Sequence, residues 1–278
     1  MAELRLLPKH RPVPAAYPPE GKRRFRLTVE FHGTAYSGWQ RQLNGPSVQQ
    51  TLEEALLRLT GEETAVIGSS RTDAGVHARG LVAHFDSTAR IPAEKMAFAL
   101  NSVLPDDVRI RGSAPAPAGF HARYSACGKV YSYRFWNARH ACAIGRQYTA
   151  HVPVPMDEGA MDRAARLLEG VHDFAAFAAS GSVARSTVRT VYRAQVRRRG
   201  DTVELLMLGD GFLYNMVRIA AGTLCEIGTG KRTQEGILRA LETGDRLQLG
   251  VTAPACGLTL EAALYEGEEE KALSFFGE

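Results

Sequence analysis

The sequence contains no run of about 18 consecutive apolar residues, so it offers no candidate for a transmembrane helix. Its N-terminus has basic residues but no apolar core of signal-peptide length, and we therefore expect a cytoplasmic protein. The four cysteines are widely spaced and form no Cys-x-x-Cys pair, which argues against a zinc site. Gly-x-Gly-x-x-Gly and Walker motifs are also missing, so we expect neither a metal nor a cofactor.

Most of the chain lacks an excess of charge of either sign. Residues 1–24 hold six basic and two acidic side chains and account for the net charge of +4, whereas the remainder holds 28 of each sign. Binding to nucleic acid would then depend on local clusters, and the clearest is residues 185–199, which contain no acid. Its arginines are Arg185, Arg189, Arg193, Arg197, Arg198 and Arg199. They could contact phosphates or simply form a solvated strand face.

The first domain is predicted over residues 25–115, after an extended Pro-rich and basic tail over residues 1–24. Ser47 and Gln50 form a capping box that opens a helix ending before Gly61. The predicted order is a strand at 25–31, this helix, strands at 64–68 and 80–86, a helix from Pro92, and a strand at 108–110. This is the split βαβ order of ferredoxin-like domains.

The second domain is predicted over residues 116–278, after a Pro/Ala/Gly-rich link at 113–119. It repeats the element order approximately, with paired strands near 186–198 and 202–208 and a helix after Gly211. The expected fold class is therefore α+β, with two ferredoxin-like (split βαβ) domains that have antiparallel sheets.

The octapeptide Arg71-Thr72-Asp73-Ala74-Gly75-Val76-His77-Ala78 lies between two predicted strands, which places Asp73 at a turn. Gly75 can adopt the positive φ that a sharp reversal requires. Arg71, two residues before Asp73, would lie on the same face and help to keep the carboxylate ionised. Taken alone, the pattern also fits an ordinary turn with a solvated carboxylate.

The octapeptide has companions in a fixed order. They are Tyr36-x-Gly38-Trp39-Gln40-Arg41-Gln42, Phe120-His121-Ala122-Arg123, Tyr131-x-Tyr133, Asp173-Phe174 and Met216-Val217-Arg218. Together these blocks resemble the signature of the tRNA pseudouridine synthase A family, over roughly residues 25–265. Ser70 stands where many members have a glycine.

The resemblance implies an isomerase that converts uridine into pseudouridine at positions 38 to 40 of the tRNA anticodon stem-loop, acting as a homodimer without a cofactor. It makes Asp73 the catalytic nucleophile, attacking either C1′ or C6, and Arg218 its direct partner. Tyr131 would stack on the flipped uracil, and Arg71 would shape the turn and contact RNA. Because the uridine must leave the helical stack, the two domains are expected to join around a central RNA-binding cleft, where Arg123 binds phosphates.

Two further expectations concern side chains near these motifs. Tyr36 and Trp39, interleaved with Arg41, suit stacking on bases if they are exposed, although a buried tryptophan is the commoner case. His77 and His121 are interpreted as structural hydrogen-bonding residues rather than acid/base groups. Three alternative functions stay open: a noncatalytic RNA-binding protein, a synthase acting on another RNA, and a nucleoside hydrolase.

Overall fold

The structure is a computed structural model that describes residues 4, 6, 17–117, 119–179, 181 and 185–277. The chain forms two compact units. The N-terminal unit contains the described residues of Leu7–Cys127 together with Leu260–Glu266. The C-terminal unit contains the described residues of Met1–Leu6, Gly128–Thr259 and Gly267–Glu278. Most of the predicted tail, residues 1–24, lies outside the described residues. Within the described ranges, every helix is too short or too polar to span a bilayer.

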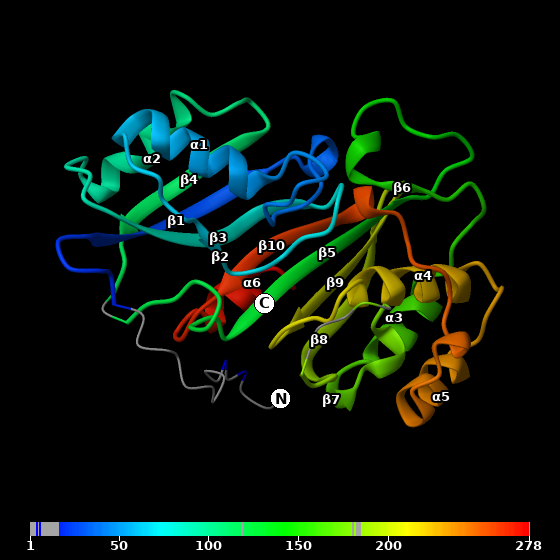
Figure 1. Ribbon diagram of the computed structural model, residues 1–278. Helices are drawn as coiled ribbons and strands as arrows, with labels where there is room; N and C mark the ends of the chain where they lie inside the picture. The colour runs from blue at the N-terminus through cyan, green and yellow to red at the C-terminus, as the bar shows by residue number, and fades with distance from the viewer. Residues whose placement is uncertain are drawn as a thin grey trace. The chain divides into compact units, whose positions relative to one another are not determined.

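The N-terminal unit is a sheet with two helices on one face (Figure 1). Its elements are β1 (Arg23–Phe31), α1 (Val48–Thr60), β2 (Ile67–Gly68), β3 (His77–Ser87), α2 (Met96–Asn101), β4 (Val108–Pro115) and most of β10 (Leu258–Leu264). The strand order is β4-β1-β3-β10, and β2 pairs with β3. The pairs β1 with β3, β1 with β4 and β2 with β3 are antiparallel.

The predicted β1 strand and α1 helix are confirmed. Along β1, alternate side chains are fully buried, as the period of two requires, and the Phe25 ring stacks on Phe85 of β3 with centroids 4.8 Å apart. The Ser47 hydroxyl accepts a hydrogen bond from the Gln50 amide at 3.3 Å and caps the start of α1. Gly61 ends the helix in the left-handed conformation, with φ +72°.

Three other predictions differ from the structure. The strand expected at 64–68 is only the two-residue β2, because its pairing with β3 is limited to Ile67 and Gly68. The helix expected from Pro92 begins with a turn of 3-10 helix and becomes α-helical at Met96. β4 runs to Pro115, so the segment predicted as a link begins as strand paired with β1. The described residues of 116–127 cluster with the N-terminal unit, and the domain boundary between residues 115 and 116 stays a prediction.

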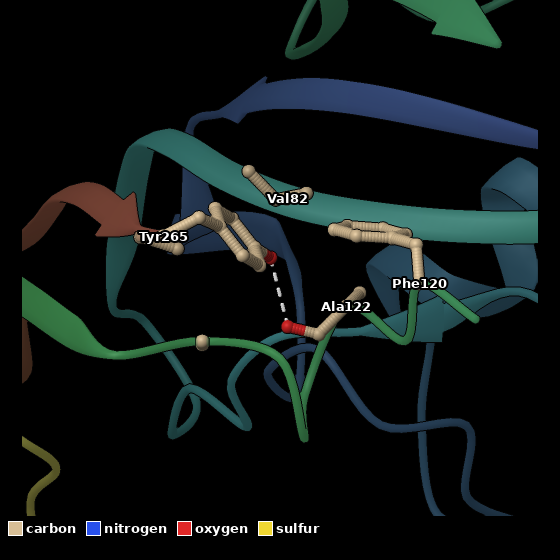
Figure 2. Packing of buried hydrophobic residues seen from close by; sticks show 6 residues of the cluster. Val82, Phe120, Ala122 and Tyr265 are labelled. Carbon is tan, nitrogen blue, oxygen red and sulfur yellow. Dashed lines mark hydrogen bonds between the residues drawn. The ribbon is translucent and has the colours of Figure 1, made fainter. Parts of the chain in front are cut away.

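A small hydrophobic cluster supports the chain after β4. Phe120, Ala122 and Ala126 pack with Val82 of β3 and with two residues near the end of β10, Ala263 and Tyr265 (Figure 2). The Tyr265 hydroxyl donates a hydrogen bond to the Ala122 carbonyl oxygen at 2.8 Å. This irregular segment is thereby fixed to the sheet, although its described residues form no strand or helix.

The C-terminal unit also combines a sheet with helices. Its elements are β5 (Gly128–Trp136), β6 (Ala150–His151), α3 (Glu158–Arg166), β7 (Gly170–Asp173), β8 (Val188–Arg199), β9 (Thr202–Gly209), α4 (Met216–Gly228), α5 (Glu235–Thr243) and α6 (Glu269–Ser274). The strand order is β5-β9-β8-β7, and α3 and α4 lie side by side (Figure 1). The predicted pairing of strands through Gly200 is confirmed by β8 and β9.

Candidate active site

Asp73 lies in the connection between β2 and β3, at the predicted turn. The Val76 amide donates a hydrogen bond to the Asp73 carbonyl oxygen at 3.2 Å, and Gly75 has φ +77°. A positive φ at the third position is what a type II turn requires, and glycine adopts it without strain. The Asp73 side chain is half-buried, whereas that of Arg71 is exposed.

A second loop, residues 33–39, packs on the Asp73 turn through its backbone. The Gly75 amide donates to the Tyr36 carbonyl oxygen, and the Trp39 amide donates to the Thr72 carbonyl oxygen, both at 3.2 Å. A Cβ atom on Gly38 would overlap the Thr72 carbonyl oxygen. The two loops therefore hold each other at a distance that only a glycine at position 38 permits.

His77 closes the same turn on its other side. Its Nδ1 atom accepts a hydrogen bond from the Gly33 amide at 3.0 Å, and its ring stacks on that of His32 with centroids 4.9 Å apart. The side chain is 2% exposed. The interpretation of His77 as a structural hydrogen-bonding residue is confirmed.

Tyr36 and Trp39 are core residues, so the expectation that they are exposed for base stacking is wrong. The Tyr36 hydroxyl donates to Asp107 at 2.8 Å. Burial and the Asp107 carboxylate together raise the pKa of Tyr36 to about 12. The Trp39 ring is 2% exposed and lies against Gly68, where any side chain would collide with it. Both side chains anchor the loop whose backbone contacts the Asp73 turn.

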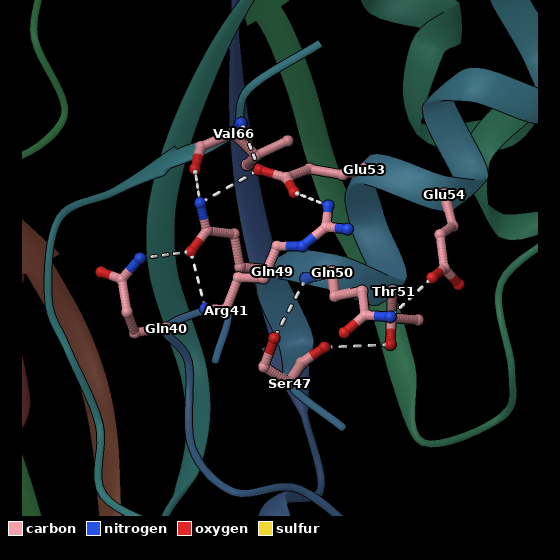
Figure 3. Close-up of polar contacts among 9 residues, drawn as sticks. All are labelled: Gln40, Arg41, Ser47, Gln49, Gln50, Thr51, Glu53, Glu54 and Val66. Carbon is pink, nitrogen blue, oxygen red and sulfur yellow. Dashed lines mark hydrogen bonds and ion pairs between the residues drawn. The ribbon is translucent and has the colours of Figure 1, made fainter. Parts of the chain in front are cut away.

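Two side chains of α1 fix the loop that carries Arg41 (Figure 3). The Gln49 side-chain oxygen accepts hydrogen bonds from the Gln40 side chain at 2.8 Å and from the Arg41 amide at 2.9 Å. Glu53 accepts from the Gln49 amide group at 3.0 Å, the Val66 backbone at 3.1 Å and the Arg41 guanidinium at 3.0 Å. Arg41 is thus tied to the protein by an ion pair.

Two hydroxyl groups beside Asp73 are buried without a hydrogen-bond partner among the described residues. They belong to Ser70, which is 5% exposed, and Thr72, which is 8% exposed. A buried hydroxyl without a partner costs about 1–3 kcal/mol. The buried hydroxyls of Ser70 and Thr72, on either side of Arg71, therefore lower the stability of the folded protein.

Tyr131 and Arg218 lie in the C-terminal unit. Tyr131 is on β5, is 6% exposed, and meets the Phe212 ring edge-to-face with centroids 5.3 Å apart. Arg218 lies in the first turn of α4 and is half-buried. Its Nε donates to the Ala253 carbonyl oxygen and its Nη1 to the Asn215 side-chain oxygen, each at 2.8 Å.

Asn215 was missed by the sequence analysis. Among the described residues it is the single non-glycine residue with a positive φ, +61°, and it immediately precedes α4. A residue with a Cβ is strained in the left-handed region of φ. The hydrogen bond that the Asn215 side chain accepts from Arg218 offsets part of this cost. The positive φ of Asn215 is a property of the folded backbone and has no signature in the local sequence.

The arginine cluster of residues 185–199 is largely engaged within the protein. Arg197 pairs with Glu204 at 2.7 Å, and Arg198 pairs with Glu158 at 3.0 Å. The Arg193 guanidinium lies over the ring of Phe276, 5.3 Å from the ring centroid. Beyond the register shift between Val191 and Arg193, alternation along β8 places Arg193, Arg197 and Arg199 on one face and Arg198 on the other.

The structure places the predicted site residues in two sets. Arg71, Asp73 and Arg123 belong to the N-terminal unit, and Tyr131 and Arg218 belong to the C-terminal unit. Within the first set, Arg71 and Asp73 share one loop, whereas Arg123 is an exposed residue of the segment after β4.

Comparison with known proteins identifies the family of the chain. The family model described as tRNA pseudouridine synthase matches residues 27–125 and 164–266. The tRNA pseudouridine synthase A of Ruminiclostridium cellulolyticum is 47% identical over 87% of this chain and 100% of that protein. The protein of the same description from Acetivibrio thermocellus is 46% identical over the same shares.

A likeness to solved structures is weaker. The solved "Structure of H/ACA RNP bound to a substrate RNA containing 2'-deoxyuridine" matches 73% of this chain and 43% of its own, with 12% identity and a TM-score of 0.35. That likeness is too low to support an argument. The family model covers well over half of the chain and the relatives align over their whole length, so the chain belongs to the tRNA pseudouridine synthase family.

Proposed function

We propose that this protein converts uridine into pseudouridine in tRNA, with Asp73 as the nucleophile. The observation that carries the proposal is the Asp73 turn, which two sets of backbone contacts hold in one conformation in a chain of this family. Covalent catalysis by a carboxylate depends on such fixation, because a positioned nucleophile avoids the entropic cost of orientation.

The reaction needs no redox change and no group donor. The N1–C1′ bond of uridine breaks, the uracil turns, and a C5–C1′ bond forms to the same sugar carbon. The C5 proton leaves and N1 gains a proton, so substrate and product are isomers. The Asp73 carboxylate adds to C1′ or to C6 of the uridine and is released when the new bond has formed.

The remaining site residues act on the RNA or on Asp73 in this proposal. Tyr131 stacks on the flipped uracil, since its ring is already fixed edge-to-face by Phe212. Arg218 is aimed by Ala253 and Asn215 and stabilises the ionised form of Asp73. Arg71 and Arg123 have exposed side chains, which suits contact with RNA phosphates.

We also infer that each unit is ferredoxin-like. In the N-terminal unit the element order β1-α1-β2-β3-α2-β4, with strand order β4-β1-β3 and β2 against β3, supports this topology. In the C-terminal unit the elements β5, α3, β8, β9 and α4, with strand order β5-β9-β8, support the same arrangement, to which the short strands β6 and β7 are added beside β5 and β8. The family resemblance supports a cytoplasmic homodimer that acts on the anticodon stem-loop.

Release of tritium from unmodified tRNA labelled at C5 of uridine tests the proposal. Wild-type protein is expected to release tritium, and the anticodon stem-loop should then contain pseudouridine. Asp73→Ala and Asp73→Asn should release none while binding tRNA within about threefold of wild type, because one carboxylate makes no favourable phosphate contact.

Two outcomes would refute it. If wild type binds tRNA tightly but releases no tritium from any tRNA, the protein is a noncatalytic RNA-binding protein or acts on another RNA. If Asp73→Asn retains turnover, the nucleophile is a different residue.

A further inference from the structure

The segment Phe120–Ser125, which carries Arg123, is held in place by side chains from the sheet. The Arg24 Nη1 of β1 donates a hydrogen bond to the Phe120 carbonyl oxygen at 2.6 Å. The Tyr265 hydroxyl donates to the Ala122 carbonyl oxygen at 2.8 Å (Figure 2). The His84 Nδ1 of β3 accepts from the Ala122 amide at 3.1 Å. Three distant elements therefore satisfy the backbone of one irregular turn.

His121 organises the same turn from within. Its Nδ1 accepts hydrogen bonds from the amides of Arg123 and Tyr124, both at 3.2 Å. Its own amide donates to the Ser125 hydroxyl at 3.0 Å, and the Ser125 amide donates back to the His121 carbonyl oxygen at 2.9 Å. The imidazole thus plays the part that an asparagine side chain plays in an Asx-turn.

Both imidazoles must be neutral for these contacts. A protonated imidazole carries hydrogen on both ring nitrogens, so its Nδ1 could no longer accept from a backbone amide. The His84 and His121 rings also lie edge-to-face, with centroids 4.8 Å apart, and His121 packs on Tyr124 at 4.3 Å. Two charged rings at that separation would repel each other.

Burial, followed by the surrounding charges, favours the neutral form of both rings. Arg24 is paired with Asp86 through two hydrogen bonds of 2.8 and 2.7 Å and faces both histidines. Burial, followed by the charges of Arg24 and His121, lowers the pKa of His84 to about 4, against an opposing effect of Asp86. Burial, Arg24 and Arg123 likewise lower the pKa of His121.

Arg26 is a further charge beside the turn. Its guanidinium lies over the rings of Phe120 and Tyr265, 5.4 and 4.5 Å from the two centroids. Within this set, the side chain of Arg123 is the exposed one. Arg24 and Arg26 contact other residues of the protein, so Arg123 is the cation that the turn presents to solvent.

We propose that His84 and His121 are positioning residues that fix the Phe120–Ser125 turn so that Arg123 meets a tRNA phosphate. The proposal rests on the function inferred above. A cation on an ordered turn loses less conformational entropy on binding than one on a mobile loop. The two histidines would therefore contribute to tRNA affinity through Arg123, without contacting RNA themselves.

Paired variants of His121 test the inference by direct tRNA binding. His121→Phe retains an aromatic ring but has no acceptor, whereas His121→Asn retains an acceptor for the Arg123 amide. We expect His121→Phe to weaken tRNA binding roughly 10-fold and His121→Asn to stay within about twofold of wild type. His84→Phe and His84→Asn should repeat the pattern. For each variant KM should rise while kcat changes less than about twofold.

The coupling to Arg123 separates positioning from general stability. Arg123→Gln should weaken binding by a similar factor and lower the slope of log Kd against log salt by about one phosphate contact. Adding His121→Phe to Arg123→Gln should cause no further loss. Circular dichroism and the urea midpoint establish that each variant is folded.

Additive losses in the double variant, or unchanged tRNA affinity in folded His121→Phe, would overturn the inference. A loss in kcat at constant KM would do so as well. The inference survives if wild type binds tRNA with this pattern but shows no turnover, in which case the proposed function alone fails. A wild-type protein that does not bind tRNA would refute both.

Discussion

The backbone of Gly38 lies directly against the carbonyl oxygen of Thr72, the residue before Asp73. Gly38 also has φ +96°, a conformation that residues with a Cβ rarely adopt. Two independent requirements therefore demand glycine at this position, and both serve the placement of the Asp73 turn.

Gly38→Ala should accordingly destabilise the protein by more than about 2 kcal/mol and remove most activity, since strain and overlap act together. Gly61→Ala is the matched control. Gly61 has φ +72°, but no atom lies within 4 Å of the position that a Cβ would take, so its replacement should cost only about 1 kcal/mol and leave activity intact. Urea denaturation and tritium release measure the two effects. Equal losses in both variants would show that the close approach is unimportant.

Thr72→Val should stabilise the protein by about 1 kcal/mol, because it replaces a buried hydroxyl without a partner by a methyl group of similar size. Thr223→Val is the opposite case. The Thr223 hydroxyl donates to the Ile219 carbonyl oxygen at 2.8 Å and accepts from the Gly250 amide at 3.0 Å. Its loss should cost about 1–3 kcal/mol. Urea midpoints that move in the same direction would contradict this interpretation of Thr72.

Stability should fall as the pH is lowered through the range set by His84. Its pKa is about 4 in the folded protein and 6.5 in the unfolded chain, so between these values the unfolded chain binds the additional proton. Lowering the pH from about 6.5 to 4 should therefore cost roughly 3 kcal/mol from this group. His84→Asn should remove that part of the dependence. Parallel curves of unfolding free energy against pH for the two proteins would refute the assignment.

Arg197→Ala should destabilise the protein by about 1–2 kcal/mol, because the half-buried guanidinium bonds Glu204 and the Phe275 carbonyl oxygen. Arg199, two residues further along the same strand, is exposed, and Arg199→Ala should change stability by less than about 0.5 kcal/mol. Thermal or urea unfolding of the two variants gives the comparison. A large effect of Arg199→Ala would mean that it has a structural partner.

Asn215→Gly should lower kcat about 10-fold with little loss of stability. Glycine relieves the strained φ of +61°, but Arg218 loses the oxygen that aims its guanidinium. Asn215→Asp keeps an acceptor for Arg218 and should recover most of the rate. Single-turnover kinetics on tRNA provide the measurement, and full activity in Asn215→Gly would show that this contact does not position Arg218.

Several features were predictable because they depend on local rules. The β1 alternation, the cap at Ser47 and the Gly75 turn follow from residue spacing and backbone preference, and all are confirmed. The interpretation of His77 was confirmed as well, since its motif left little room for a free imidazole. The predicted lengths of β2 and β4 were wrong, because strand ends are set by pairing partners rather than by composition.

The sequence by itself determined the mixed α and β elements and the family, because both are encoded in short motifs and in their order. Only the tertiary structure decided which polar groups meet. It buried Tyr36 and Trp39, engaged Arg197 and Arg198 in ion pairs, and brought His84 to the Arg123 turn. Such contacts join residues far apart in the chain, so burial and hydrogen bonding, which depend on all neighbours at once, are settled only when the chain has folded.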